Sequence, residues 1–437
     1  MAGSVFRRRV GAAAGMYLSI VLGFLGTIVA ARVFSTEVLG EYALVLASAG
    51  FLQALLDLTI EEALIKFGFG YVARENWGRL RRMFRRVFAF KAVGAVLGGL
   101  ALLLLAALSP RLFGTGDLRT PLAVAALLPL AQAPEGMAGV ALMLHGRYDL
   151  RGGFFAFSMG LRLAAIAVGS QYGLTWTIAA IVIAQVAASA AIGVAGLLAF
   201  RRFPESEPTP LAEDSGRLVR FILQSSAATG IVAMRSTLTP IVLGIVSTVT
   251  QVGYFRVAQS PQQGFNAVSA PFRLVLMTEQ TRDWERGDRR RVFAGIRRYT
   301  LLATAGCLVL LPPLLVFMPQ IIRLLFEAKN LGAVDAARVI VCAGAVQFVV
   351  GWSKSFAVTI GRPHLRTWTH TVETAVLLPL AILLGWRWGA VGAAAAVLAA
   401  SVVFAAVWAA LFARIKREPA PPTTQATQPG PLVEIQA

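Results

Sequence analysis

Apolar runs of about 20 residues recur along the whole chain, and they constrain its fold more than any other feature. The hydrocarbon core of a bilayer is about 30 Å thick, so a helix of about 20 apolar residues can cross it. Of the 437 residues, 57% are hydrophobic and only 14% are charged, whereas a soluble protein carries about 25% charged residues. Because helices satisfy their own backbone hydrogen bonds in lipid, the sequence predicts an all-α polytopic membrane protein.

About twelve runs are long enough to cross the membrane. The first follows Arg7-Arg8-Arg9 and is too long for a signal peptide, and no small-residue cleavage site closes it. We therefore interpret it as an uncleaved span. The expected spans are 10–31, 41–66, 84–109, 121–145, 153–171, 175–200, 218–246, 251–280, 296–325, 336–360, 366–386 and 388–413.

Positive charge is distributed unequally between alternate loops. The formal net charge is +19. With the N-terminus inside, about 26 Lys and Arg residues lie on the cytoplasmic side and about 7 in the outer loops, as the positive-inside rule requires. This asymmetry predicts a multi-pass protein of the cytoplasmic (inner) membrane with both termini in the cytoplasm. It also accounts for the net charge without a nucleic-acid partner.

A change of composition near the middle divides the chain into two halves. Residues 203–216, FPESEPTPLAEDSG, are rich in Pro and Glu and are typical of a linker. We expect a six-helix lobe over residues 1–202 and a second one over 217–417. The tail 418–437 is rich in Pro, Thr and Gln, which predicts a disordered cytoplasmic segment.

A short internal repeat links the halves. FSTEVLGEYALVLAS (34–48) and VSTVTQVGYFRVAQS (246–260) share Ser-Thr, a short gap, then Gly and Tyr, with one residue inserted. With six spans per half, both halves enter the membrane in the same orientation. The sequence therefore predicts a parallel repeat with a pseudo-twofold axis along the membrane normal, in which the second and eighth spans face each other.

Three segments carry a family resemblance: RVFSTEVLGEYALV, ALLDLTIEEALIKFG and IVLGIVSTVTQVGYFRVAQ. They resemble the polysaccharide-biosynthesis, or O-antigen flippase, family of the multidrug, oligosaccharidyl-lipid and polysaccharide exporter superfamily. The family pattern has Asp-Leu-Gly where this chain has Asp57-Leu58-Thr59. The resemblance implies two six-helix lobes around a central cleft walled mainly by spans 1, 2, 7 and 8. It also implies flipping of an undecaprenyl-diphosphate-linked sugar to the outer leaflet.

Four arginines lie in the hairpin of the seventh and eighth spans: Arg220, Arg235, Arg256 and Arg273. A cation at the centre of a membrane helix costs roughly 2.5–3.5 kcal/mol, so it normally faces a polar interior or a partner. Guanidinium groups stay charged and bind phosphate oxygens in bidentate fashion, so we predict that these arginines bind the diphosphate. The alternative, strongest for Arg220 near a helix start, is that the side chain snorkels to the headgroups.

Three carboxylates on the second span are predicted to take part in gating or ion coupling: Glu41, Asp57 and Glu61. If the second and eighth spans face each other, Glu41 can clasp Arg256 at the outer end. Asp57 or Glu61 can clasp Arg273 at the inner end. The alternative is that each of these residues is solvated at a helix end.

Two further pairs of opposite charge lie at matched depths on consecutive spans. We predict that Glu135 pairs with Arg162 and that Lys354 pairs with Glu373, as structural bridges inside each lobe. If these charges do not meet, the same residues become candidates for cavity ligands.

The sequence predicts no catalytic residue, metal site or cofactor. Cys307 and Cys342 lie in apolar spans without metal-ligand spacing, and the three histidines are scattered. The predicted function is that of a non-enzymatic flippase, a monomer that moves a polyprenyl-diphosphate-linked oligosaccharide beside other polysaccharide-assembly membrane proteins.

Two alternatives remain. A drug/cation antiporter on the same fold would line its cleft with carboxylates and aromatics, whereas the cleft-lining spans expected here carry more arginine. A polytopic glycosyltransferase or polymerase would need a large external loop, whereas the longest expected here has about a dozen residues.

Overall fold

The computed structural model describes residues 2–56, 60–211, 214–262, 280, 283–284 and 287–418. Helices are the only regular secondary structure in these ranges. Nine helices in the described part are long and apolar enough to cross a membrane. The all-α polytopic class predicted from the sequence is therefore confirmed.

The N-terminal half contains the first six expected spans. Its elements are α1 (Ala2–Val33), α2 (Thr36–Leu56), α3 (Ile60–Ala73), α4 (Trp77–Phe113), α5 (Arg119–Ala125), α6 (Leu128–Gln132), α7 (Glu135–Leu144), α8 (Tyr148–Gly169), the short 3-10 helix η1 (Ser170–Tyr172) and α9 (Leu174–Arg201). Helix α8 packs between α1 and α9, and α7 packs on α9 and α3.

The fourth span is broken into the three short helices α5, α6 and α7. Pro129 stands in the first turn of α6, and Pro134 is the residue that precedes α7. Proline lacks a backbone N–H and fixes φ, so it starts a helix readily and interrupts one that is already running. These breaks place Gln132 at the end of α6 and Glu135 in the first turn of α7.

The C-terminal half contains α10 (Asp214–Val246), helical residues 249–262, α12 (Arg289–Val316), α13 (Met318–Phe326), the 3-10 helix η2 (Ala328–Ala333), α14 (Val334–Val349), α15 (Ser353–Thr359) and α16 (Pro363–Arg417). With 55 residues, α16 is too long for a single crossing. It bends at Gly389, where φ is 56°, and so forms the eleventh and twelfth expected spans.

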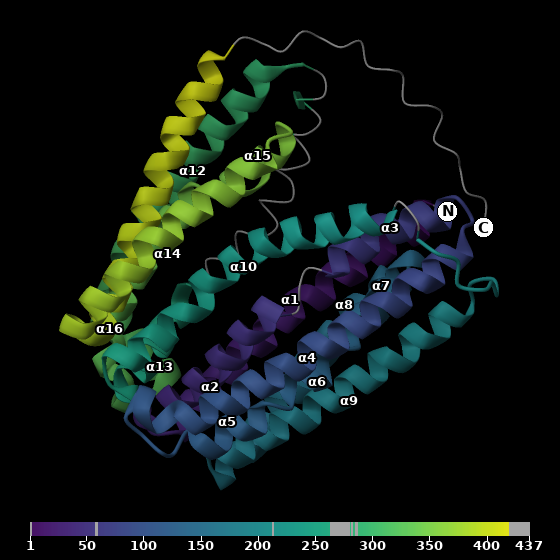
Figure 1. Ribbon diagram of the computed structural model, residues 1–437. Coiled ribbons are helices and arrows are strands. Elements are labelled where there is room, and N and C mark those ends of the chain that lie inside the picture. The colour runs from purple at the N-terminus through teal and green to yellow at the C-terminus, as the bar shows by residue number, and fades with distance from the viewer. Residues whose placement is uncertain are drawn as a thin grey trace.

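The two halves meet at one end and diverge toward the other, in a V-shaped arrangement (Figure 1). The largest buried cluster lies where they meet and includes Phe34 and Leu39 from the first half with Val252, Phe255 and Ile340 from the second. Helix α10 packs on α2 as well as on α16, and so contacts both halves. On the topology predicted from the loop charges, the end where the halves meet is the outer end.

Polar contacts seal this outer end. The guanidinium group of Arg32 donates to the carbonyls of Leu324 (2.6 Å) and Leu325 (3.0 Å). Asn330, which is fully buried, accepts a hydrogen bond from the hydroxyl of Thr36 at 3.1 Å. These contacts join the α1–α2 corner to α13 and η2.

Non-helical residues 203–211 follow α9 and lie along the start of α4. The Phe203 ring stacks on Trp77 and on His145, with ring centroids 5.4 and 4.1 Å apart. The amide of Thr209 donates to the carbonyl of Gly78 at 3.2 Å. This segment is therefore packed against the N-terminal half.

Candidate functional site

Arg256 projects from helical residues 249–262 toward the N-terminal half. Its Nη2 donates to the hydroxyl of Thr27 on α1 at 3.3 Å. Tyr42 on α2 and Arg162 on α8 lie within electrostatic range of the guanidinium group. The structure therefore places one of the four predicted phosphate ligands, half-buried, on the wall that the two halves share.

Arg162 is the unexpected neighbour of Arg256. It is half-buried in the middle of α8, and it makes neither a hydrogen bond nor an ion pair with any residue that the structure describes. Two guanidinium groups, one from each half, are thus within electrostatic range of each other, and neither forms an ion pair with a carboxylate among the described residues. Like charges repel in a low-dielectric interior, so this arrangement favours an anion that binds both.

The other three predicted phosphate ligands are placed less completely. Arg220 lies in the second turn of α10 with an exposed side chain, where snorkelling remains the alternative to phosphate binding. The backbone of Arg235 belongs to α10, but its side chain lies outside the described part of the structure. Arg273 lies wholly outside the described residues.

Glu41 does not clasp Arg256, although the outer ends of the two halves are in contact. Glu41 is buried in α2, and the carboxylates of Asp117 and Glu37 lie within electrostatic range of it. Among the described residues Arg256 donates to Thr27 instead. The expected outer clasp is therefore not formed in this conformation, in which Arg32 and Asn330 hold the outer end.

The expected inner clasp is only partly described, since Asp57 and Arg273 both lie outside the described residues. The third member, Glu61, is described and engages other partners. Its Oε2 accepts from Nη2 of Arg151 at 2.7 Å, and its Oε1 lies 3.9 Å from Nζ of Lys91. Glu61 is thus held inside the N-terminal half, between α3, α4 and α8.

Glu135 extends this group of charged side chains but does not pair with Arg162. Its Oε2 accepts from Nε2 of Gln185 on α9 at 2.9 Å, and Gln185 in turn accepts from Gln132 at 3.0 Å. Glu61, together with Lys91 and Arg151, lies within electrostatic range of Glu135. We call Glu61, Lys91, Glu135, Arg151 and Gln185 the N-half charge cluster.

The N-half charge cluster lies directly against the backbone of α7. A Cβ atom at Gly136 would lie 2.0 Å from Oε1 of Glu61 and 2.6 Å from Nζ of Lys91. The glycine therefore leaves the space that the carboxylate occupies. Lys91 is 4% exposed, and two carboxylates with two cations make the cluster neutral overall. A formally neutral arrangement of this kind suits a scaffold, and its two carboxylates could also bind and release a transported cation.

In the C-terminal half, Glu373 is buried in α16. Its Oε2 lies 3.0 Å from Nδ1 of His370, whose ring stacks on Phe404. The predicted partner Lys354 belongs to α15, but its side chain lies outside the described part, so the predicted pair stays a prediction. The i,i+3 spacing of His370 and Glu373 on one helix was the signal available in the sequence for this contact.

Comparisons with known proteins connect this architecture to membrane transporters. No protein-family model matches the sequence, and no curated protein matches it. Solved structures do match. The "Lipid II flippase MurJ, inward closed conformation" superimposes with a TM-score of 0.68 at 12% identity, covering 93% of this chain and 88% of that one.

An inward-facing multidrug-resistance MATE transporter of the MOP superfamily also gives a TM-score of 0.68, at 14% identity, with 92% of this chain and 96% of that chain covered. A MOP superfamily transporter from Pyrococcus furiosus, described as having a binding pocket of reverse polarity, gives 0.61 at 12% identity, covering 94% and 95%. The chain therefore has the fold of these transporters, about twelve transmembrane helices in two six-helix lobes related by a parallel pseudo-twofold repeat.

Proposed function

We propose that this protein is an alternating-access flippase that moves a polyprenyl-diphosphate-linked oligosaccharide from the cytoplasmic to the outer leaflet for cell-surface polysaccharide synthesis. The observation that carries this proposal is the pair of guanidinium groups of Arg256 and Arg162, one from each half, without a carboxylate partner among the described residues. A diphosphate brings the negative charge and the multiple oxygens that two such groups bind best.

The shape of the molecule fits one end state of such a transporter. The outer ends of the halves are sealed by Arg32 and Asn330, and the opposite ends diverge (Figure 1). Rocking of one half against the other would part the outer seal and close the opposite end. Arg235 and Arg273 on the same hairpin are proposed as further phosphate ligands along this path. Glu41, Asp57 and Glu61 are proposed as groups whose contacts change during rocking.

A drug/cation antiporter is the second candidate, because the N-half charge cluster holds two carboxylates, Glu61 and Glu135, in a polar environment. Matches to a lipid II flippase and to multidrug transporters are equally compatible with either candidate at the level of the fold. The guanidinium pair favours an anionic substrate over a cationic drug, because a cation would be repelled by Arg256 and Arg162.

Reconstitution in liposomes tests the proposal. A fluorescent polyprenyl-diphosphate oligosaccharide is placed in one leaflet, and its appearance in the other is followed by quenching. We expect Arg256→Ala and Arg162→Ala each to slow transfer at least about tenfold, as loss of a charged hydrogen bond of about 1.5–3 kcal/mol implies. Arg387→Ala is the control, because Arg387 is exposed on the bend of α16. Arg256→Lys should rescue only in part, since lysine lacks the planar fork.

Two results would contradict the proposal. If both alanine variants transfer the lipid at the wild-type rate, Arg256 and Arg162 do not bind it during transport. Export of a cationic dye driven by a proton or sodium gradient, with no transfer of the labelled lipid, would identify the antiporter instead.

A further inference from the structure

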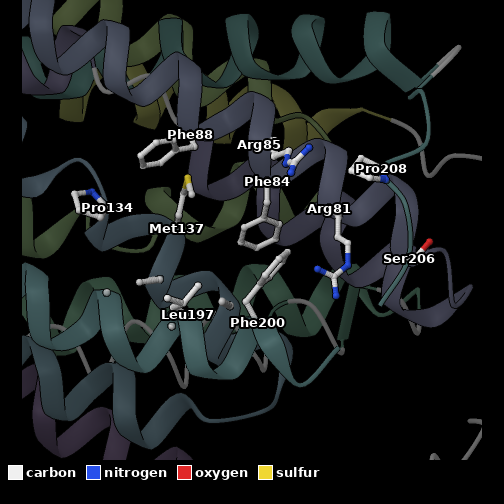
Figure 2. A pocket seen from close by; sticks show the side chains of 14 residues that line it. Arg81, Phe84, Arg85, Phe88, Pro134, Met137, Leu197, Phe200, Ser206 and Pro208 are labelled. Carbon is white, nitrogen blue, oxygen red and sulfur yellow. The ribbon is translucent and has the colours of Figure 1, made fainter. Parts of the chain in front are cut away.

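A cavity of about 520 Å³ opens at the surface of the N-terminal half, and none of the predicted phosphate ligands lines it. It lies between the first turns of α4, the start of α7 and the last turns of α9, next to residues 206–208 (Figure 2). Its volume is within the range of roughly 300–1,000 Å³ that is typical of small-molecule sites. On the predicted topology it stands at the cytoplasmic end of the membrane-spanning bundle.

The cavity is open at the surface of the helix bundle. Phe88 and Leu197, which line it from α4 and α9, are 52% and 51% exposed. Both helices carry further exposed apolar side chains along the same stretch, including Leu97, Leu100 and Val194. An exposed apolar surface of this kind on a membrane-spanning helix faces acyl chains.

The hollow exists because small residues lie opposite three aromatic rings. The close contact of α9 with α7 is at Gly196, where a Cβ atom would lie 2.5 Å from Cα of Ala138. A Cβ atom at Gly193, one turn earlier, would meet nothing within 4 Å. Because Gly193 has no side chain, the space beside it is empty, and an acyl chain can fill it. The rings of Phe84, Phe88 and Phe200 line the other sides.

Two cations stand at one end of this apolar hollow (Figure 2). Arg81 donates from Nη2 to the carbonyls of Phe203 and Pro204, at 3.2 and 3.1 Å, but its buried Nε has no hydrogen-bond partner in the part of the chain that the structure describes. Arg85, one turn along α4, is exposed and pairs with no residue that the structure describes. None of the described residues that line the cavity carries a carboxylate.

We propose that this cavity binds an anionic phospholipid of the cytoplasmic leaflet, with an acyl chain in the hollow beside Gly193 and the headgroup phosphate at Arg81 and Arg85. Basic pockets between membrane helices on the cytoplasmic side attract anionic headgroups, and the surface potential of that leaflet adds to the attraction. Because Arg81 also holds residues 203 and 204, the bound lipid contacts the chain that joins the two halves. This inference does not depend on the identity of the transported substrate.

The test uses the purified full-length protein in detergent, titrated with phosphatidylglycerol, phosphatidylcholine or inorganic phosphate. Lipid adducts are counted by native mass spectrometry, and the melting temperature is recorded in parallel. We expect phosphatidylglycerol to bind and raise the melting temperature, phosphatidylcholine to bind about tenfold more weakly, and inorganic phosphate to have no effect.

Two variants with matched controls locate the site. Arg85→Ala should weaken phosphatidylglycerol binding about tenfold. Arg82→Ala should not, because Arg82, three residues earlier in α4, is exposed and does not line the cavity. Gly193→Leu should fill the hollow and abolish binding. Gly306→Leu is its control. A Cβ atom at Gly306 also meets nothing within 4 Å, but this glycine is on α12 and not at the cavity.

The proposal is overturned if Arg85→Ala binds phosphatidylglycerol as the wild type does, or if a correctly folded Gly193→Leu protein still binds it. Equal binding of phosphatidylcholine would remove the role of the arginines. An equal response to inorganic phosphate would identify a soluble anion instead of a lipid. Tighter binding of a polyprenyl phosphate than of phosphatidylglycerol would assign the cavity to a substrate lipid.

Discussion

Gly40 and Gly253 each lie against the backbone of the other's helix where the two halves meet. A Cβ atom at Gly40 would lie 2.0 Å from the carbonyl oxygen of Val249, and one at Gly253 would lie 2.1 Å from that of Thr36. Each of these carbonyls belongs to the residue four positions before the opposite glycine. The two glycines are also the equivalent positions of the internal repeat, so the contact sits on the pseudo-twofold axis.

Replacing either glycine by alanine should destabilise this contact. The opposing atoms belong to the backbone and cannot rotate away. We therefore expect Gly40→Ala and Gly253→Ala each to destabilise the conformation with a closed outer end by about 1–3 kcal/mol. The measurement is the melting temperature in detergent. Gly306→Ala, where a new Cβ meets nothing, should hold or raise it, since alanine is favoured over glycine in a helix by roughly 0.5–1 kcal/mol. Unchanged melting for both interface variants would mean that the helices separate freely.

This contact also shows how far the sequence predicts the fold. The runs of apolar residues predicted the spans, and the matched Ser-Thr, Gly and Tyr of residues 34–48 and 246–260 predicted that the second and eighth spans face each other. The expected boundary between spans 366–386 and 388–413 lies beside the bend at Gly389, whereas hydropathy did not show the breaks around α6. An apolar run has the same hydropathy whether its helix is straight or broken.

The ion pairs were harder to predict than the helices. Glu135 and Arg162 lie on consecutive spans at matched depth, but depth does not fix the rotation of a helix about its axis. Helix α7 turns Glu135 toward Gln185 on α9, while Arg162 lies within range of Arg256. The signal that could have found the first contact is Gln185 itself, an amide within the otherwise apolar run of α9.

The Glu61–Arg151 pair should contribute measurable coupling to stability. The two side chains are 35% and 20% exposed and their charged atoms are 2.7 Å apart. A double-mutant cycle with Glu61→Gln and Arg151→Met should give a coupling free energy of about 0.5–3 kcal/mol. The control cycle uses Asp288 and Arg291, a more exposed i,i+3 pair, for which about 0.2–1 kcal/mol is expected. Equal coupling in the two cycles would show that the N-half charge cluster adds nothing beyond a surface pair.

Stability should fall in mild acid because of His145. Burial, with Arg202 acting in the same direction, lowers the pKa of His145 below its ordinary value of 6.5. Below about pH 6.5 the unfolded chain therefore binds a proton that the folded chain does not, and the free energy of unfolding decreases as the pH falls. The melting temperature should drop between pH 8 and pH 5.5, and less so in His145→Phe, which keeps a ring against Phe203. His364→Ala is the control at an exposed histidine. An identical drop in His145→Phe would exclude His145 as the titrating group.

Asn330 should be the residue that holds the outer seal. Its side chain is fully buried and reaches three elements: Nδ2 donates to the carbonyls of Ala31 (3.2 Å) and Phe326 (2.7 Å), and Oδ1 accepts from Thr36 (3.1 Å). Removing the Asn330 side chain takes a hydrogen-bond donor away from these buried carbonyls, which costs about 1–3 kcal/mol for each carbonyl left unsatisfied. The contacts with Ala31 and Thr36 cross between the halves and exist only while these ends touch, whereas the contact with Phe326 lies within the C-terminal half. Loss of the two crossing contacts therefore falls on this conformation and shifts the population toward one that is open outside.

Spin labels on exposed outer positions 116 and 387, one in each half, report that shift as a longer distance. We expect Asn330→Ala to increase the fraction of long distances about fivefold or more, which corresponds to about 1 kcal/mol. Lys329→Ala serves as the control, because the lysine lies at the half-exposed rim and donates to the carbonyl of Arg32 without bridging three elements. If both variants leave the distance distribution of the wild type unchanged, the outer seal depends on the packing of Gly40 against Gly253 and not on Asn330.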